Sequence, residues 1–320
     1  MNAAVVEDFS ISPRYTTFAD PVPSEKELLV KVSAAGLHPI VKALANGSHY
    51  GSTGELPFVP GVDGVGRLED GTRVYFGATR PPFGTFAEYA VTQSWMCLPV
   101  PEKMSDLVAA GIANPGMSSM AALKERAQLV PGENVLILGA TGVAGHLAVQ
   151  IARHLGAKRV VGAGRSPQAL EQLLGLGANA VISLDQTHDA LVAAFRREIA
   201  EESVNVVLDY LWGPPAECVL EAIAQKGLKH ASPRIRFVQV GESAGKAITL
   251  PAATLRSSGV ELLGSGFGSA SIQQIMQAVG EFLKDASEGQ FKFNTKAVPL
   301  SDVAALWKAA GHGERLVFQP

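Results

Sequence analysis

The sequence is poor in cysteine and has no long hydrophobic run. Its two cysteines, Cys97 and Cys218, lie far apart and outside any C-x-x-C pattern, so they provide neither a disulfide framework nor a cysteine-built zinc site. No apolar stretch reaches the roughly 18 residues of a membrane span. The N-terminus lacks the basic region and apolar core of a secretory signal. We therefore expect a cytoplasmic protein.

Positive charge is also scarce. The 27 lysines and arginines are outnumbered by 30 acidic residues, which gives a formal net charge of −3. No basic tail or charge block occurs along the chain. Since nucleic acids and anionic membranes attract strongly basic surfaces, we expect neither as a partner.

The residues that are present are sufficient for two domains, because the 320-residue chain is 47% hydrophobic. The most informative stretch is Glu133–Ser166. Asn134–Leu138 is a short apolar run typical of a strand, and helical spacing of apolar residues begins after His146. Gly156 ends the helix before a second strand at Val160–Ala163. This pattern predicts a βαβ unit with a glycine-rich first turn.

The glycine-rich turn predicts a phosphate-binding site. A side chain at Gly142 would hold a pyrophosphate away from the N–H groups at the start of the helix. The G-x-G-x-x-G pattern is not met in full, because Ala140 stands at its first position. The alternative is a tight turn with no ligand. The residues predicted to contact the cofactor here are Thr141, Gly142, Val143, Ala144 and Gly145.

The end of the second strand indicates the type of dinucleotide. An NAD site places a carboxylate there for the ribose hydroxyls, whereas this chain has Gly164, Arg165 and Ser166. An arginine and a hydroxyl suit a 2′-phosphate, because arginine presents a planar set of charged donors. NADP(H) is therefore favoured over NAD(H). The alternative is that Arg165 is only a solvated loop charge.

The order of predicted elements gives an α/β fold. Residues 1 to about 112 are rich in predicted strands, with one helix at Pro39–Asn46, and a helix at Pro115–Val130 follows. Helices and strands then alternate, which predicts a doubly wound parallel sheet. The final elements break this alternation and are expected to return to the first domain. The predicted domains are residues 1–113 with 265–320, and residues 114–264.

Several segments together resemble the medium-chain dehydrogenase/reductase superfamily, and within it the zinc-free members similar to quinone oxidoreductases. The matching segments are Lys31–Pro39, Pro57–Gly66, Gly84–Tyr89 and Pro131–Val135, the last leading into the glycine-rich turn. The resemblance implies a GroES-like catalytic domain made from both chain ends, a Rossmann domain between them, and an NADP(H) cofactor in the interdomain cleft. It also implies a homodimer formed by pairing the edge strands at Val260–Leu263.

The resemblance further implies a reductase without zinc. The positions of the three zinc ligands in zinc-dependent relatives look like His38, Val62 and Asn114 here, and valine cannot bind a metal. Without a Lewis acid, hydride addition to a quinone or to an α,β-unsaturated carbonyl is easier than alcohol oxidation. We therefore expect a small conjugated acceptor as the substrate.

The resemblance also suggests catalytic residues. Related zinc-free members carry an aromatic residue near Tyr50, whose hydroxyl could donate a proton, although Tyr50 could instead only cover a loop. His38 stands where quinone-reductase relatives often have asparagine, so a hydrogen-bond donor is retained. Its ring is expected to titrate near neutral pH. Asp63 and Asn114 fall near the nicotinamide end, where turn capping is the alternative role of Asp63. Backbone groups at the carboxyl edge of the sheet are expected to bind the nicotinamide ribose and carboxamide, from Gly241, Gly264, Ser265 and Gly266.

Two other functions remain open on the sequence alone. An enoyl-thioester reductase would need a deep pocket and basic residues for a carrier phosphate, and no basic cluster stands near the expected cleft segments. A non-catalytic NADPH-binding sensor or structural protein is the other alternative, which the unusual His38, Val41 and Asn114 keep open.

Overall fold

The computed structural model describes residues 1–225, 233–309 and 314–320, and these form two compact units. Unit 1 comprises Met1–Asn114, Val279–Gly289 and Phe293–Pro320. Unit 2 comprises Pro115–Ala278 and Gln290–Lys292. Residues 265–278 therefore belong to unit 2, whereas the sequence analysis placed a boundary after Gly264.

Unit 1 is built on a seven-stranded sheet and a two-stranded sheet. The larger sheet has the order β14-β15-β3-β4-β5-β7, with β6 also paired to β3, and the smaller sheet pairs β1 with β2. The strands are β1 (Asn2–Val5), β2 (Arg14–Thr17), β3 (Glu27–Gly36), β4 (Asp63–Arg67), β5 (Arg73–Gly77), β6 (Tyr89–Gln93), β7 (Cys97–Pro99), β14 (Thr295–Pro299) and β15 (Arg315–Gln319). The sequence pattern does not predict β2.

The two ends of the chain share the larger sheet. Strand β15 runs antiparallel to β3, with Val317 opposite Gly36 and Phe318 opposite Ala35. The apolar residues of β1, β3 and β15 then pack around Phe86, which touches the rings of Trp307 and Phe318. The helices here are α1 (Pro39–Ala45) and α9 (Val303–Leu306), with 3-10 turns at Ser94–Met96 and Leu300–Asp302.

Unit 2 has a six-stranded parallel sheet of order β10-β9-β8-β11-β12-β13. The reversal of order at β8 and β11 is that of a Rossmann fold, and the predicted doubly wound parallel sheet is confirmed. The strands are β8 (Asn134–Leu138), β9 (Arg159–Gly164), β10 (Ala180–Ser183), β11 (Val206–Asp209), β12 (Arg234–Gln239) and β13 (Gly259–Gly264). The helices are α3 (Val143–His154), α4 (Pro167–Gly175), α5 (His188–Glu202), α6 (Gly213–Ile223) and α7 (Ala252–Arg256).

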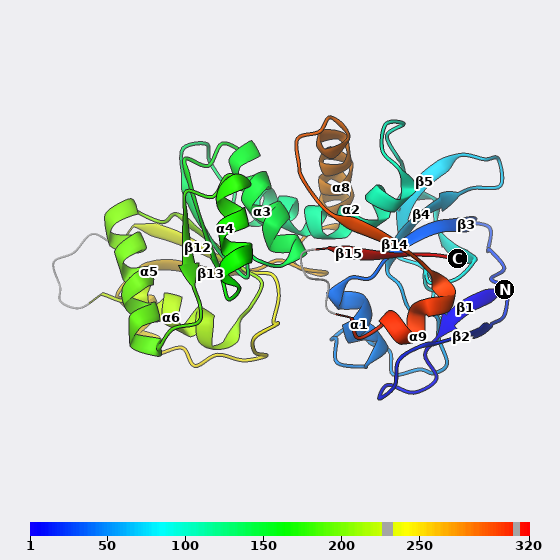
Figure 1. The fold of residues 1–320 in the computed structure, drawn as a ribbon, viewed down its shortest axis with the longest axis horizontal. Helices are drawn as coiled ribbons and strands as arrows, with labels where there is room; N and C mark the ends of the chain where they lie inside the picture. The colour runs from blue at the N-terminus through cyan, green and yellow to red at the C-terminus, as the bar shows by residue number, and fades with distance from the viewer. Residues whose placement is uncertain (226–232, 310–313) are drawn as a thin grey trace. The chain divides into compact units, whose positions relative to one another are not determined.

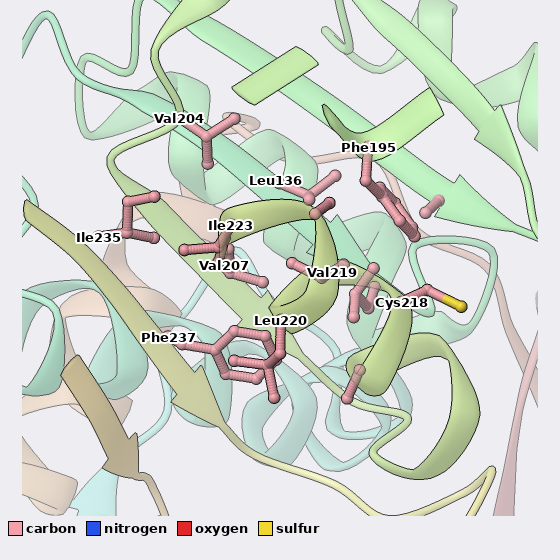
Figure 2. Close-up of a cluster of buried hydrophobic side chains, with 14 of the residues drawn as sticks. Leu136, Phe195, Val204, Val207, Cys218, Val219, Leu220, Ile223, Ile235 and Phe237 are labelled. Atoms are coloured by element: carbon pink, nitrogen blue, oxygen red, sulfur yellow. The ribbon is translucent and has the colours of Figure 1, made fainter. Parts of the chain in front are cut away.

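The main core of unit 2 lies between the sheet and the neighbouring helices α5 and α6, which lie side by side (Figure 1). Figure 2 shows the side chains of Phe195, Val219 and Leu220 with those of Val207 and Phe237 from the strands. All five side chains are almost completely buried. Burying a side chain of this size contributes about 1.5–3 kcal/mol, so this layer fixes the strand ends that carry the site.

Helix α2 corrects one prediction. The expected helix was Pro115–Val130, but α2 spans Asp106–Ala121, contains Pro115, and continues into a π-helical turn at Ala122–Arg126. The Ser105 hydroxyl accepts a hydrogen bond from the Val108 N–H at 3.3 Å and marks the real start. Proline removes one backbone hydrogen bond from the helix, and the alanine-rich sequence on both sides tolerates this loss.

Two long helices, α2 and α8 (Ile272–Ser287), contribute residues to both units. Among the residues that the structure describes, none of the helices combines the length and the apolar character that a membrane crossing requires.

Candidate functional site

The glycine-rich turn between β8 and α3 is fixed by hydrogen bonds to β9. Gly139 has a positive φ of 79°, and its N–H and that of Ala140 both donate to the Ala163 carbonyl, at 3.0 and 2.9 Å. Gly142 caps α3 with extended backbone, and its carbonyl accepts the first helical hydrogen bond from His146 at 2.8 Å. The preceding N–H groups of α3 therefore have no partner within the helix.

Two glycines of the turn have different roles. A Cβ atom at Gly145 would lie 2.3 Å from the Gly139 carbonyl oxygen, so glycine is needed for α3 to approach the turn. A Cβ atom at Gly142 would meet only that same oxygen, at 3.6 Å. The space at Gly142, just before the first-turn residues Val143 and Ala144, is therefore open, as a bound pyrophosphate requires.

A side chain in place of Gly164, at the end of β9, would crowd Thr141. A Cβ atom at Gly164 would lie 2.3 Å from the Thr141 side chain. The next residue, Arg165, is exposed and has no ion pair with any residue that the structure describes. Ser166 accepts a hydrogen bond from the Ala169 N–H at 3.3 Å and caps α4, while its own hydroxyl proton remains available to a ligand.

The loops after β12 and β13 lie at the same sheet edge as the glycine-rich turn, because all six strands are parallel. The Gly241 N–H donates to the Asp209 carbonyl at 3.1 Å, and the Ser265 N–H donates to the Gln239 carbonyl at 2.8 Å.

Further contacts engage the neighbouring residues of the loop after β13. The Gly264 carbonyl accepts from Arg126 Nε at 2.7 Å. The Gly266 N–H donates to Ser269 Oγ at 2.7 Å. Several of the backbone groups expected to bind the nicotinamide end are therefore engaged within the protein.

Unit 1 contains a buried polar cluster made of His38, Asp63, Tyr75 and Arg315. The Tyr75 hydroxyl donates to one Asp63 carboxyl oxygen at 2.8 Å, and the other oxygen lies 3.4 Å from His38 Nε2. Arg315 donates through one guanidinium nitrogen to the Leu37 carbonyl at 2.6 Å. Both ring nitrogens of His38 and Arg315 Nε lack a hydrogen-bond partner among the described residues.

Burial controls the charges of this polar cluster. Desolvation raises the pKa of Asp63 to about 7, although the Tyr75 hydrogen bond and Arg315 oppose the rise. Desolvation also lowers the pKa of His38 well below its usual value, and the charge of Arg315 adds to this effect. The expectation that His38 titrates near neutral pH is therefore wrong, because its ring stays neutral there. Burial also lowers the pKa of Arg315 to about 10.

The four predicted catalytic residues do not form one group. His38 and Asp63 lie together, and Asp63 begins β4 with a side chain that receives a hydrogen bond from a distant tyrosine rather than capping a turn. Tyr50 is 75% exposed and its ring stacks on His49, with centroids 4.2 Å apart, so it lies outside the buried cluster. Asn114 is half-buried within α2.

Sequence reasoning missed several residues of interest. Tyr75 and Arg315 complete the buried cluster, and nothing in their local sequence indicates it. The Tyr210 hydroxyl hydrogen-bonds to Ser119 Oγ at 2.7 Å, and burial raises the pKa of Tyr210 to about 12. Trp212 has a positive φ of 55°. The only sequence signal for Trp212 is the bulk of Asp209–Gly213 at the end of β11.

Metal ligands do not gather in the part of the chain that the structure describes. No group of three or more histidine, cysteine, aspartate and glutamate side chains there is able to hold an ion. His38 has one carboxylate neighbour, Asp63, and the adjacent Val62 offers no donor atom. A zinc ion with four protein or water ligands needs a richer donor set.

Comparison with known proteins places these features in context. A family model described as "Zinc-binding dehydrogenase" matches residues 143–284. The chain is 29% identical to a probable NADPH-dependent quinone reductase, tdiC, of Emericella nidulans, over 100% of each chain. It is also 29% identical to the quinone oxidoreductase of Homo sapiens, over 60% of each chain.

A solved structure shows the same fold over the whole chain. The quinone oxidoreductase of Thermus thermophilus, which was also solved in complex with NADPH, superimposes with a TM-score of 0.81. The two chains are 26% identical, and the match covers 100% of each. The segment matched by the family model contains none of the three positions His38, Val62 and Asn114, so its description does not bear on their ability to bind zinc.

Proposed function

Because this chain belongs to the medium-chain dehydrogenase/reductase superfamily, as a zinc-free member resembling quinone oxidoreductases, we propose that it uses NADPH to reduce quinones or α,β-unsaturated carbonyl compounds. The observation that carries the proposal is the pairing of an open glycine-rich turn with Gly164 and Arg165 at the end of β9. A full-length relative named as an NADPH-dependent quinone reductase supports it.

The residues of unit 2 fit NADP(H). The open space above Gly142 and the free N–H groups of the first turn of α3 suit the pyrophosphate. At the end of β9, Thr141 fills the place of a carboxylate, and the exposed Arg165 guanidinium suits the 2′-phosphate. The loops at Gly241, Gly264, Ser265 and Gly266 are proposed to hold the nicotinamide ribose and carboxamide.

When bound, NADPH supplies a hydride, and the protein has to stabilise the oxyanion that forms on the acceptor and to provide a proton. The hydroxyl of Tyr50, a residue that is 75% exposed, is the proposed proton donor, and water is the alternative donor. The neutral His38 ring and the Asp63 carboxyl hold their protons inside unit 1. Asn114 remains a proposed contact of the nicotinamide end.

The class of acceptor follows from which metal ligands the described residues could provide. Reducing a simple ketone requires strong polarisation of its oxygen, which zinc supplies in related enzymes. Conjugated acceptors spread the developing charge over several atoms and need less help. Since the described residues provide no zinc site, a quinone or an enone is the acceptor that this chain is best equipped to reduce.

We also propose that the protein is a homodimer. Strand β13 forms one edge of the sheet of unit 2, and Leu262 on that strand is 38% exposed. Pairing two such edges would satisfy the exposed backbone groups of both strands. The cytoplasmic location expected from the sequence stays a prediction.

The proposal is tested by measuring NADPH consumption by the purified protein with 1,4-naphthoquinone, 2-cyclohexen-1-one and an enoyl-CoA thioester as acceptors. Saturable turnover with the quinone or the enone, and a lower kcat/KM with the thioester, supports the proposal. Preference for the thioester would assign the protein to enoyl reduction instead. Tight NADPH binding without turnover of any acceptor would indicate a sensor or structural protein.

A further inference from the structure

A pocket of about 380 Å³ opens at the carboxyl ends of β11, β12 and β13, within unit 2. Pockets of this size are typical of small-molecule sites. Its lining combines aromatic and aliphatic residues with polar and charged ones. The pocket is lined by Trp212, Phe237, Gln239, Glu242, Lys246, Leu262, Leu263 and Gly264.

The backbone of Trp212 is strained. Its φ of 55° and ψ of −164° lie close to a region that is almost restricted to glycine. A bulky residue in such a conformation costs about 1–3 kcal/mol. The Asp209 carboxylate maintains it by accepting the N–H groups of Leu211 at 2.8 Å and Trp212 at 3.1 Å. A tryptophan at a position that favours glycine points to a use for its ring.

The Trp212 ring forms part of the pocket wall. It meets the buried Phe237 ring at 68°, with centroids 6.2 Å apart, and Leu262 and Leu263 extend the apolar wall. A planar aromatic ligand gains both burial and favourable ring contacts from such a surface. The half-buried state of Trp212 leaves part of its ring accessible to that ligand.

The polar side of the pocket supplies a cation. Lys246 and Glu242 are both exposed, and neither forms an ion pair with a residue that the structure describes. The Gln239 side-chain amide donates a hydrogen bond to the Gly241 carbonyl at 3.0 Å. Lys246 is therefore able to bind a carbonyl or hydroxyl oxygen of a ligand whose ring lies on the apolar wall.

We propose that this pocket binds the aromatic ring of the acceptor, with an acceptor oxygen facing Lys246, and that Trp212 makes the enzyme prefer aromatic quinones over non-aromatic enones. The inference rests on the proposed function. It is favoured by the position of Gly264, which lines the pocket and is also a proposed contact of the nicotinamide end. The pocket thus adjoins the loops expected to hold the reacting end of the cofactor.

The kinetic test compares Trp212→Gly and Trp212→Phe with the wild type, using 1,4-naphthoquinone and 2-cyclohexen-1-one. We expect the glycine variant to lower the ratio of kcat/KM for the quinone over the enone about tenfold, through KM, while Trp212→Phe keeps most of the ratio. The melting temperature of Trp212→Gly should not fall, because glycine adopts the positive φ without strain.

Three results would overturn the inference. An unchanged ratio would show that Trp212 does not select the acceptor. A rise in the KM for NADPH as large as the rise in the KM for the quinone would make Trp212 a cofactor contact instead. A lower melting temperature together with dissociation of a dimer would make it a packing residue for a second copy of the chain.

A binding measurement separates this inference from the proposed function. We expect 1,4-naphthoquinone to quench tryptophan fluorescence saturably in the presence of NADP⁺, and the saturable part to disappear in Trp212→Phe but not in Trp95→Phe, where the lost ring is exposed. Saturable quenching without turnover would support the pocket and refute the reductase. Turnover without quenching specific to Trp212 would refute the pocket.

Discussion

The glycine-rich turn of unit 2 and the buried polar cluster of unit 1 differ in which groups they present and in how far those groups are enclosed. The turn offers backbone N–H groups in an open space that Gly142 leaves free. The cluster of His38, Asp63, Tyr75 and Arg315 encloses ionisable side chains and suppresses charge on the first two. A site of the first kind is sensitive to added volume, whereas one of the second kind is sensitive to pH. The following predictions test this difference.

The largest effect is expected from Gly145→Ala. The new methyl group would lie 2.3 Å from the Gly139 carbonyl oxygen and 2.5 Å from Ala140 Cα, both of them backbone atoms. We predict loss of measurable NADPH binding and a melting temperature lower by about 5 °C or more. Calorimetric titration with NADPH and thermal unfolding measure both effects.

The matched control for this variant is Gly142→Ala, because its methyl group meets only one atom, at 3.6 Å. This variant should unfold at the wild-type temperature and bind NADPH about tenfold more weakly, since the methyl group occupies the space for phosphate. Equal losses of stability in both variants would contradict the separate roles of the two glycines.

The second prediction concerns Arg165. Removing a guanidinium that binds a phosphate weakens binding by about ten- to a hundredfold, so Arg165→Ala should raise the KM for NADPH by that factor and leave the KM for NADH unchanged. Arg196→Ala, at another exposed arginine, serves as the control. If the KM for NADPH does not move, the assignment of the 2′-phosphate site to Arg165 is wrong.

The third prediction concerns the polar cluster. In the folded protein Asp63 keeps its proton up to about pH 7, whereas the unfolded chain loses it near 3.8. The folded state therefore binds more protons within this window, and the stability that Asp63 contributes falls as the pH rises through it. Asparagine does not ionise. The melting temperature of Asp63→Asn relative to wild type should therefore rise by about 5 °C between about pH 4 and pH 7.

The control is Asp70→Asn, because Asp70 is exposed and its pKa is lowered by the Thr72 backbone hydrogen bond. Its relative melting temperature should not rise over the same range. A constant difference between Asp63→Asn and wild type at all pH values would show that Asp63 ionises normally inside unit 1.

The smallest effect is expected from Tyr50→Phe. Because Tyr50 is 75% exposed, water can replace it as a proton donor, so we predict a fall in kcat of about threefold rather than the hundredfold or more of a sole general acid. The measurement is kcat with 1,4-naphthoquinone and 2-cyclohexen-1-one. Wild-type kcat with both acceptors would remove Tyr50 from the mechanism.

The sequence predicts the glycine-rich turn well because all of its determinants are local. Gly139, Gly142 and Gly145 lie within one βα turn, and their spacing reflects contacts between neighbouring residues. The doubly wound parallel sheet of unit 2 follows from the alternation of helices and strands for a similar reason. The family resemblance then extends this prediction to both units.

The polar cluster could not be predicted from local pattern, because its members come from β4, β5, β15 and the residue before α1. The sequence alone leaves His38 at an ordinary pKa, and only complete burial reveals that it stays neutral. Pro115 misled the helix prediction because tertiary context overrides the usual exclusion of proline from helix interiors. The backbone conformation of Trp212 could not be predicted either, because bulky residues rarely adopt a positive φ.

The central claim is that this chain is an NADPH-specific reductase that needs no metal. It is tested most directly by measuring kcat/KM for NADPH and for NADH with saturating 1,4-naphthoquinone, before and after exhaustive chelation of the protein. The account predicts a preference for NADPH of about tenfold or more and the same rates after chelation. Loss of activity on chelation that zinc restores, or a preference for NADH, would contradict it.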